Sequence, residues 1–175
     1  MNAHVFVDET KERGLLVAAA VVLPADLAAA RRTVRALILP GQRRIHFHKE
    51  KDDRRRQIIA AVVTLPAHAV IFDARRHRDP RAAREGCLVE LVDHAAKINA
   101  ARLVLERDDS TFQADRRLLF EQVRKSGTSG NLRYDQLRAH EECLLAIPDA
   151  VAWCWAKGGR WRTSVQRVVR ETRQV

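Results

Sequence analysis

The sequence predicts an α/β domain with a mixed central sheet flanked by helices. The chain opens with two apolar, β-branched segments separated by a polar turn, which is typical of a hairpin. After the hairpin, apolar stretches of strand length alternate with segments of helical periodicity. Crossover helices make the later strands parallel, so an opening hairpin followed by such units gives a mixed sheet. With 175 residues and 46% hydrophobic content, we expect one domain over 1–175.

The first half of the chain supplies the hairpin and two helical segments. A strand over 4–7 ends at Asp8-Glu9, and the apolar run 15–23 is its partner. Pro24 suits the first turn of a helix, which Pro40-Gly41 stops. The elements expected next are a short strand over 44–48, a helix from 52 or 53 through 64, and a strand over 69–73.

The second half continues the alternation of helices and strands. Leu88, Leu91, Val92 and Ala95 share one face of a helix over 80–99, and an apolar strand over 102–106 follows. The remaining elements expected are a helix over 111–125, a Gly/Ser loop, an edge strand over 133–137, a helical segment over 141–157 interrupted at Pro148, and a last short helix over 165–172.

The charge of the chain favours a polyanionic partner. Lys and Arg number 32 against 22 Asp and Glu, which gives a net charge of +10. Such a field suits nucleic acid first and an acidic membrane surface second, although a coding bias toward Arg and Ala would also produce it. Three cysteines without a Cys-x-x-Cys pair indicate reduced thiols. We find no secretory signal and no run long enough to span a bilayer, so we expect a cytoplasmic protein.

Acidic residues follow two of the predicted strands and open a helix. Asp8 and Glu9 end the first strand, Glu106 ends a later one with Asp109 close behind, and Asp149 follows Pro148. If the two strands are parallel neighbours, their carboxyl ends meet at one edge, where a helix could add Asp149. Clustered carboxylates repel one another unless a cation lies among them, and oxygen ligands select Mg²⁺ or Mn²⁺. The alternative is that these acids are solvated loop residues or helix caps.

Three segments resemble a large bacterial family of RNase H-like domains. Val5-Phe6-Val7-Asp8-Glu9-Thr10 is similar to the family's opening strand, which ends in Asp-Glu-Ser. Ile45-His46-Phe47-His48 resembles its His-containing segment. The segment 145–153 resembles its closing helix, which carries an Ala-Asp pair. The order of the segments matches over nearly the whole chain.

This resemblance implies an RNase H-like fold and a metal-dependent nuclease site. Carried over by position, Asp8, Glu106 and Asp149 would hold the metal and act in catalysis, and Glu9 or Asp109 could complete the ligand set. The layout is also similar to RuvC-type resolvases and transposase cores. Some residues depart from the family pattern: Thr10 replaces Ser, Ala146 replaces Gln, Pro148 replaces Ala, and His46 stands where a Glu is expected.

Other side chains have both a functional and a structural interpretation. His48 could transfer protons near the metal, or lie on the polar face of an edge strand with His46. Trp155 and Trp161 could stack on unpaired bases, although large aromatic side chains more often pack in a core. The arginines expected to bind phosphates, or else to form ion pairs on a solvated surface, are Arg54, Arg55, Arg75 and Arg76.

We therefore expect a Mg²⁺- or Mn²⁺-dependent nuclease that hydrolyses phosphodiester bonds of DNA or RNA. The main alternative is a module that keeps the fold and binds nucleic acid or a partner protein without catalysis, because one carboxylate is missing near His46. A toxin-like RNA cleaver is a third option.

Overall fold

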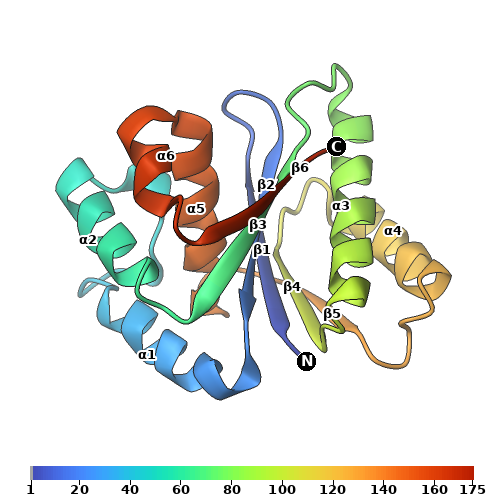
Figure 1. Cartoon of the computed structure of the whole chain (residues 1–175), viewed down its shortest axis with the longest axis horizontal. Helices are drawn as coiled ribbons and strands as arrows, with labels where there is room; N and C mark the ends of the chain where they lie inside the picture. The colour runs from blue at the N-terminus through green and yellow to red at the C-terminus, as the bar shows by residue number, and fades with distance from the viewer. Residues whose placement is uncertain (1) are drawn as a thin grey trace.

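The computed structural model describes residues 2–175, which form a six-stranded mixed sheet with helices on both faces (Figure 1). The strand order is β5-β4-β1-β2-β3-β6. β2 runs antiparallel to β1 and β3, and the other neighbours pair in parallel. The strands are β1 (His4–Thr10), β2 (Leu16–Val22), β3 (Ala67–Asp73), β4 (Arg102–Glu106), β5 (Arg133–Leu137) and β6 (Val169–Gln174).

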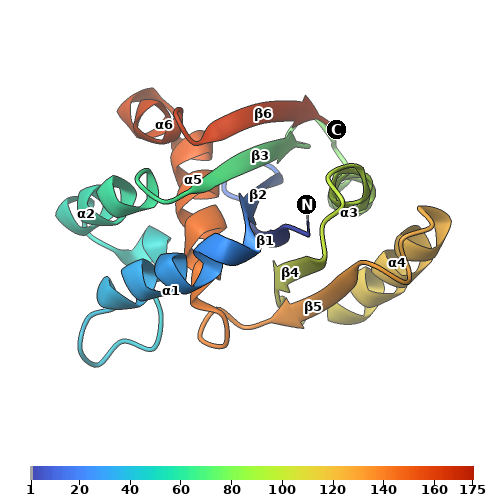
Figure 2. The same cartoon turned by 60° about the horizontal axis from the view of Figure 1, so that its bottom comes forward.

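Alternation along the strands divides the core into two clusters, one on each face of the sheet. Phe6 and Val104 pack with one set of helices, whereas Val5, Val7 and Leu105 pack with the other. Figure 2 shows the two groups of helices on opposite sides of the sheet. The first face carries α1 (Leu27–Ala36), α2 (Asp52–Val62), α5 (Ala146–Lys157) and α6 (Gly159–Val165), and the second carries α3 (Pro80–Lys97) and α4 (Phe112–Lys125).

Small side chains line the contact between α5 and the centre of the sheet. β2 is buried along its whole length, and its Ala18 and Ala20 belong to the same core cluster as Ala150 of α5. The helix packs on both β1 and β2. Pro148 lies in the first turn of α5, where its missing N–H breaks no intrahelical hydrogen bond, so the helix continues through it.

Two of the elements expected from the sequence are wrong. Residues 44–48 form no strand; instead, Phe47–Lys49 is a short 3₁₀ helix, and the buried ring of Phe47 packs against Trp153 at a centroid distance of 5.4 Å. The helix expected over 165–172 is also absent. Its place is taken by a turn and strand β6, which pairs with β3 and so satisfies backbone groups that would be unpaired at the sheet edge.

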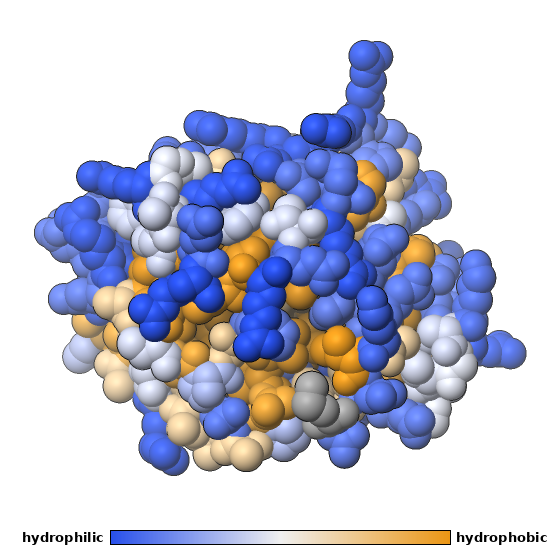
Figure 3. All heavy atoms as spheres, in the orientation of Figure 1, coloured by the Kyte–Doolittle hydropathy of each residue, from blue (hydrophilic) through white to orange (hydrophobic). Residues whose placement is uncertain are grey.

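The surface of the described chain is largely polar. Hydrophilic side chains project around the outline of the molecule in Figure 3, with apolar residues visible between them near the middle of that face. The large apolar side chains that are exposed are Leu23, Leu39 and Phe120. Within residues 2–175 no helix has both the length and the apolar character needed to cross a membrane.

Candidate active site

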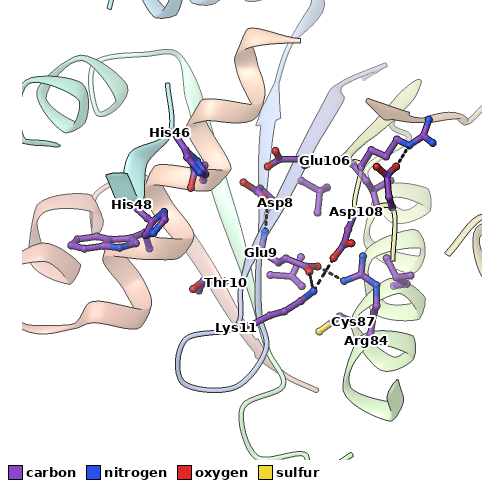
Figure 4. Close-up of a pocket in the computed structure, with 18 residues that line it drawn as sticks. Asp8, Glu9, Thr10, Lys11, His46, His48, Arg84, Cys87, Glu106 and Asp108 are labelled. Carbon is purple, nitrogen blue, oxygen red and sulfur yellow. Dashed lines mark hydrogen bonds and ion pairs between the residues drawn. The ribbon is translucent and has the colours of Figure 1, made fainter. Parts of the chain in front are cut away.

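The topology of the sheet brings Asp8 and Glu106 to the same edge. β1 and β4 are parallel neighbours in which Phe6 lies opposite Val104. Two residues further along each strand, Asp8 and Glu106 keep this alignment and emerge on the face that α5 covers. Figure 4 shows the two carboxyl groups pointing toward one another. The expectation that these two strand ends are parallel neighbours is therefore confirmed by the strand pairing.

Asp149 joins them from the first turn of α5. One of its carboxylate oxygens, Oδ2, accepts a hydrogen bond of 3.0 Å from the backbone N–H of Phe47, which fixes the side chain between the helix and the loop before α2. Burial raises the pKa of Asp149 to about 6, and the negative charge of Glu106 adds to this, against the opposing effects of the Phe47 hydrogen bond and of Arg44. The carboxyl of Asp149 is thus electrostatically coupled to Glu106.

The pKa of Asp8 is raised as well. Burial is the largest cause of a pKa well above the usual value, followed by a hydrogen bond with the Glu106 carboxyl and by the charges of Asp149 and Glu106. All three acids line one cavity of about 630 Å³, together with His46 and His48. In the protein alone, ionising all three groups is therefore unfavourable.

The chemistry of this donor set fits a hard divalent cation. Three carboxyl groups supply oxygen ligands, and a cation would relieve the repulsion that raises the pKa values of Asp8 and Asp149. Over residues 2–175, however, no three His, Cys, Asp or Glu side chains are already gathered as closely as metal ligands. Nη1 of Arg44 lies 2.8 Å from Oε1 of Glu106 and occupies one side of that carboxylate.

A second arginine holds the loop that carries the histidines. Arg55 donates hydrogen bonds to the backbone carbonyls of Phe47 and His48, and its guanidinium lies 4.3 Å from the ring centroid of Trp153. These contacts hold in place the segment whose Phe47 N–H donates a hydrogen bond to Asp149. Arg55, expected from the sequence to bind phosphate, thus has structural partners. Neither its role nor that of Arg44 has a signal in the sequence beyond closeness to the histidines.

The two histidines face each other at the mouth of the cavity (Figure 4). Their ring centroids are 5.2 Å apart in an edge-to-face arrangement. Burial lowers the pKa of His46, and the neighbouring cations Arg44 and Lys49 lower it further. His48 is exposed. His48 lies in the 3₁₀ helix and His46 directly precedes it, so neither is on a strand, but both line the cavity.

Glu9 and its partners form a separate ionic network on the other face of the sheet. Because Glu9 follows Asp8 in the strand, it points toward α3, where it forms ion pairs with Lys11 and Arg84. Arg84 also forms a bidentate pair with buried Asp115, both N···O distances being 2.7 Å. Asp108 completes the network through Lys11 at 3.0 Å. Glu9 therefore borders the same cavity as the three acids, but its carboxylate is paired with Lys11 and Arg84.

Asp109 also lies apart from the carboxyl cluster, although it borders the same cavity. Its side chain is exposed and forms ion pairs of 2.7 Å with Arg107 and 3.0 Å with Arg138. These two arginines lower the pKa of Asp109, so its carboxylate already has two counter-ions.

The residues expected to contact nucleic acid are only partly available. Trp155 and Trp161 are buried in the core, so the stacking interpretation is wrong for both and the packing interpretation holds. Arg75 is committed to a bidentate pair with Asp73, and Arg54 donates to the carbonyl of Leu37. The remaining candidate, Arg76, is exposed and has no ion pair within the described chain.

The fold of the chain is similar to that of a solved nuclease. RNase HII of Archaeoglobus fulgidus, determined in complex with PCNA, superposes with a TM-score of 0.56 at 12% sequence identity, over 95% of this chain and 74% of that one. No protein-family profile matches the sequence, and no curated protein has a significantly similar one. The fold is therefore RNase H-like, as the sequence predicts.

Proposed function

We propose that the protein is a divalent-metal-dependent nuclease that hydrolyses phosphodiester bonds of DNA or RNA. One observation carries the proposal: Asp8, Glu106 and Asp149 come from two parallel strands and a helix, and their coupled carboxyl groups line one cavity at the carboxyl edge of the sheet. Sites in open α/β sheets form at this edge. The RNase H-like fold of the chain supports the same reading.

The three acids would hold Mg²⁺ or Mn²⁺. Such an ion would supply charge stabilisation for the phosphate and acidify a bound water molecule. The chain's own contribution is to orient the ligands: the Phe47 N–H holds one oxygen of Asp149 at 3.0 Å, and the Glu9 N–H holds one oxygen of Asp8 at 2.7 Å. Glu9 and Asp109 stay predictions as further ligands, since both are paired with basic side chains.

His48 is the group we propose for proton transfer to the leaving oxygen. It is exposed and lines the same cavity as the three acids, and imidazole is the side chain that most often transfers protons in catalysis. Arg55 positions it by binding its backbone carbonyl. His46, closer to Arg44 and less exposed, has a lowered pKa and so is neutral near pH 7.

Nucleic acid is the proposed partner because the chain carries a net charge of +10 and basic side chains follow four strands at the carboxyl edge of the sheet: Lys11, Arg76, Arg107 and Arg138. Arg76 is exposed and has no ion pair within the described chain, so we propose that it contacts a phosphate. The other three are paired with acids of the same edge. We also propose that 1–175 is one RNase H-like domain and that the protein acts in the cytoplasm.

A nuclease assay with Mn²⁺ on single- and double-stranded DNA, RNA and their hybrid tests the proposal. We expect cleavage by the wild type and a loss of at least about 100-fold in Asp8→Asn, because the carboxylate is replaced by a neutral group of the same shape. The matched control is Asp79→Asn, a change of the same type at the N-cap of α3. Equal cleavage by wild type and Asp8→Asn would refute the site.

The second candidate is a catalytically inactive RNase H-like module that binds nucleic acid or a partner protein. The Arg44–Glu106 ion pair favours it, because a carboxylate neutralised by an internal cation has less need of a metal. Calorimetry with Mn²⁺ separates the two functions. Binding in the micromolar to millimolar range supports the nuclease, and its absence in both wild type and Arg44→Ala supports the module.

A further inference from the structure

Arg44 occupies a place in the carboxyl cluster where positive charge is needed. Its guanidinium is 2.8 Å from Oε1 of Glu106, and its charge also opposes the rise in the pKa of Asp149. Glu106 in turn lies beside Asp8 and raises the pKa of Asp8 (Figure 4). A single side chain from the loop between α1 and α2 therefore acts on two of the acids directly and on the third through Glu106.

The Arg44 guanidinium can move away from Glu106 into solvent without disturbing a helix or strand. The Arg44 side chain is 30% exposed and comes from a segment outside any helix or strand, so solvent is open to it. A divalent cation on the same carboxylate would lie within a few ångströms of the guanidinium and be repelled by it. Two cations thus compete for Glu106, one from the chain and one from solution.

Resting on the proposed function, we propose that Arg44 is an internal counter-ion of Glu106 that a divalent cation must displace in order to bind. In the metal-free protein, Arg44 neutralises part of the negative charge of the cluster. The cost of displacing Arg44 sets the affinity for the metal and ensures that the site fills only at sufficient metal concentration.

Titration calorimetry with Mn²⁺ alone, without nucleic acid, tests the proposal on four variants. We expect Arg44→Ala to bind Mn²⁺ roughly fivefold more tightly than the wild type, the equilibrium factor for a partly exposed ion pair near the upper end of its usual strength. Arg43→Ala is the matched control: it removes the same charge from the adjacent position, which has no ion pair within the described chain, and should change the affinity little. In a Glu106→Gln background, Arg44→Ala should not increase the affinity for Mn²⁺, because the carboxylate for which Arg44 and the metal compete is no longer present.

The outcomes separate this proposal from the nuclease itself. Tighter binding by Arg44→Ala, or binding by Arg44→Ala when the wild type binds none, supports displacement. Wild-type binding that Arg44→Ala leaves unchanged or weakens overturns the role of Arg44 and leaves the nuclease proposal standing. If Arg43→Ala increases the affinity for Mn²⁺ as much as Arg44→Ala does, the effect comes from net charge alone, and the proposed role of Arg44 is overturned. Absence of binding in every variant overturns both proposals.

Discussion

The two faces of the sheet surround their acidic residues with different partners. Asp8 and Glu9 are consecutive in β1, at the same edge of the sheet. Asp8 points to the α5 face and joins two other carboxyl groups, whereas Glu9 points to the α3 face and meets Lys11 and Arg84. The α5 face therefore holds three acids with one arginine, whereas on the α3 face Lys11 and Arg84 between them pair with every acid of the network.

The difference separates a structural role from a chemical one. On the α3 face every acid is paired with a cation of the chain, because Lys11 and Arg84 are shared among Glu9, Asp108 and Asp115. On the α5 face, the repulsion and burial that raise the pKa of Asp8 remain in the protein alone. Energy stored in this way is typical of a site that binds a charged ligand.

Removing the central cation of the paired face has the largest expected effect. Arg84 is 14% exposed and Asp115 4%, so Arg84→Met leaves Asp115 buried without a counter-ion. We expect the free energy of unfolding, measured by urea denaturation, to fall by about 3–5 kcal/mol.

Arg81→Met is the control for that change. Arg81 lies one turn earlier in α3 and pairs with Glu85 at 2.9 Å on the exposed surface, so its loss should change the free energy of unfolding by no more than about 0.5 kcal/mol. A similar loss of stability in both variants would mean that the network on the α3 face has no special role.

The two consecutive acids of β1 should respond to neutralisation with opposite signs. In the presence of a chelator at pH 7.5, Asp8→Asn should raise the free energy of unfolding, because the amide cannot ionise and so removes the burial cost and the repulsion from Asp149 and Glu106 that raise the pKa of Asp8. Glu9→Gln should lower it, since Arg84 loses a partner.

Thermal and urea unfolding of the two variants side by side measure this contrast. Destabilisation by both substitutions would show that Asp8 is a structural residue like Glu9, and the distinction between the two faces would fail.

The smallest expected effect is a pH dependence from Asp149. Its folded pKa of about 6 lies above the unfolded value near 3.9, so the folded state binds more protons between these values. Stability of the metal-free protein should therefore decrease as pH rises from about 4 to 6, by about 1 kcal/mol from this group after allowance for its partial exposure.

Urea unfolding of wild type and Asp149→Asn at pH 4.5 and 7 isolates the contribution of this group. The variant should lose less stability than the wild type between the two pH values. An identical change in both would place the pH dependence elsewhere.

The sequence predicts the strands that carry the acidic residues better than it predicts the edge of the sheet and the loops around the site. Apolar runs that end in acids predict where Asp8 and Glu106 lie, because the parallel pairing of buried strands follows from the alternation of helices and strands. The strand 133–137 also has the expected bounds. Strand β6 is not predictable in this way, because Val169–Gln174 is mostly polar and becomes a strand only by pairing with β3.

The sequence pattern likewise does not predict which loop residues contact the site. Arg44 and Arg55 look like any other basic residues, and only the folded chain places one on Glu106 and the other on the carbonyl of Phe47. Trp155 and Trp161 show the reverse: an aromatic run beside a site suggests base stacking, yet the sheet needs these rings for its core.

The alanines of β2 have a consequence that reaches beyond packing. Ala18 and Ala20, together with Ala150 of α5, let this helix approach the strands more closely than larger side chains would allow. That approach sets how far Asp149 stands from Asp8. The size of these three buried side chains thus determines how much space is left between the carboxyl groups for an ion. A larger residue at any of the three positions would push α5 away from the sheet and widen that space, although none of the three takes part in the chemistry.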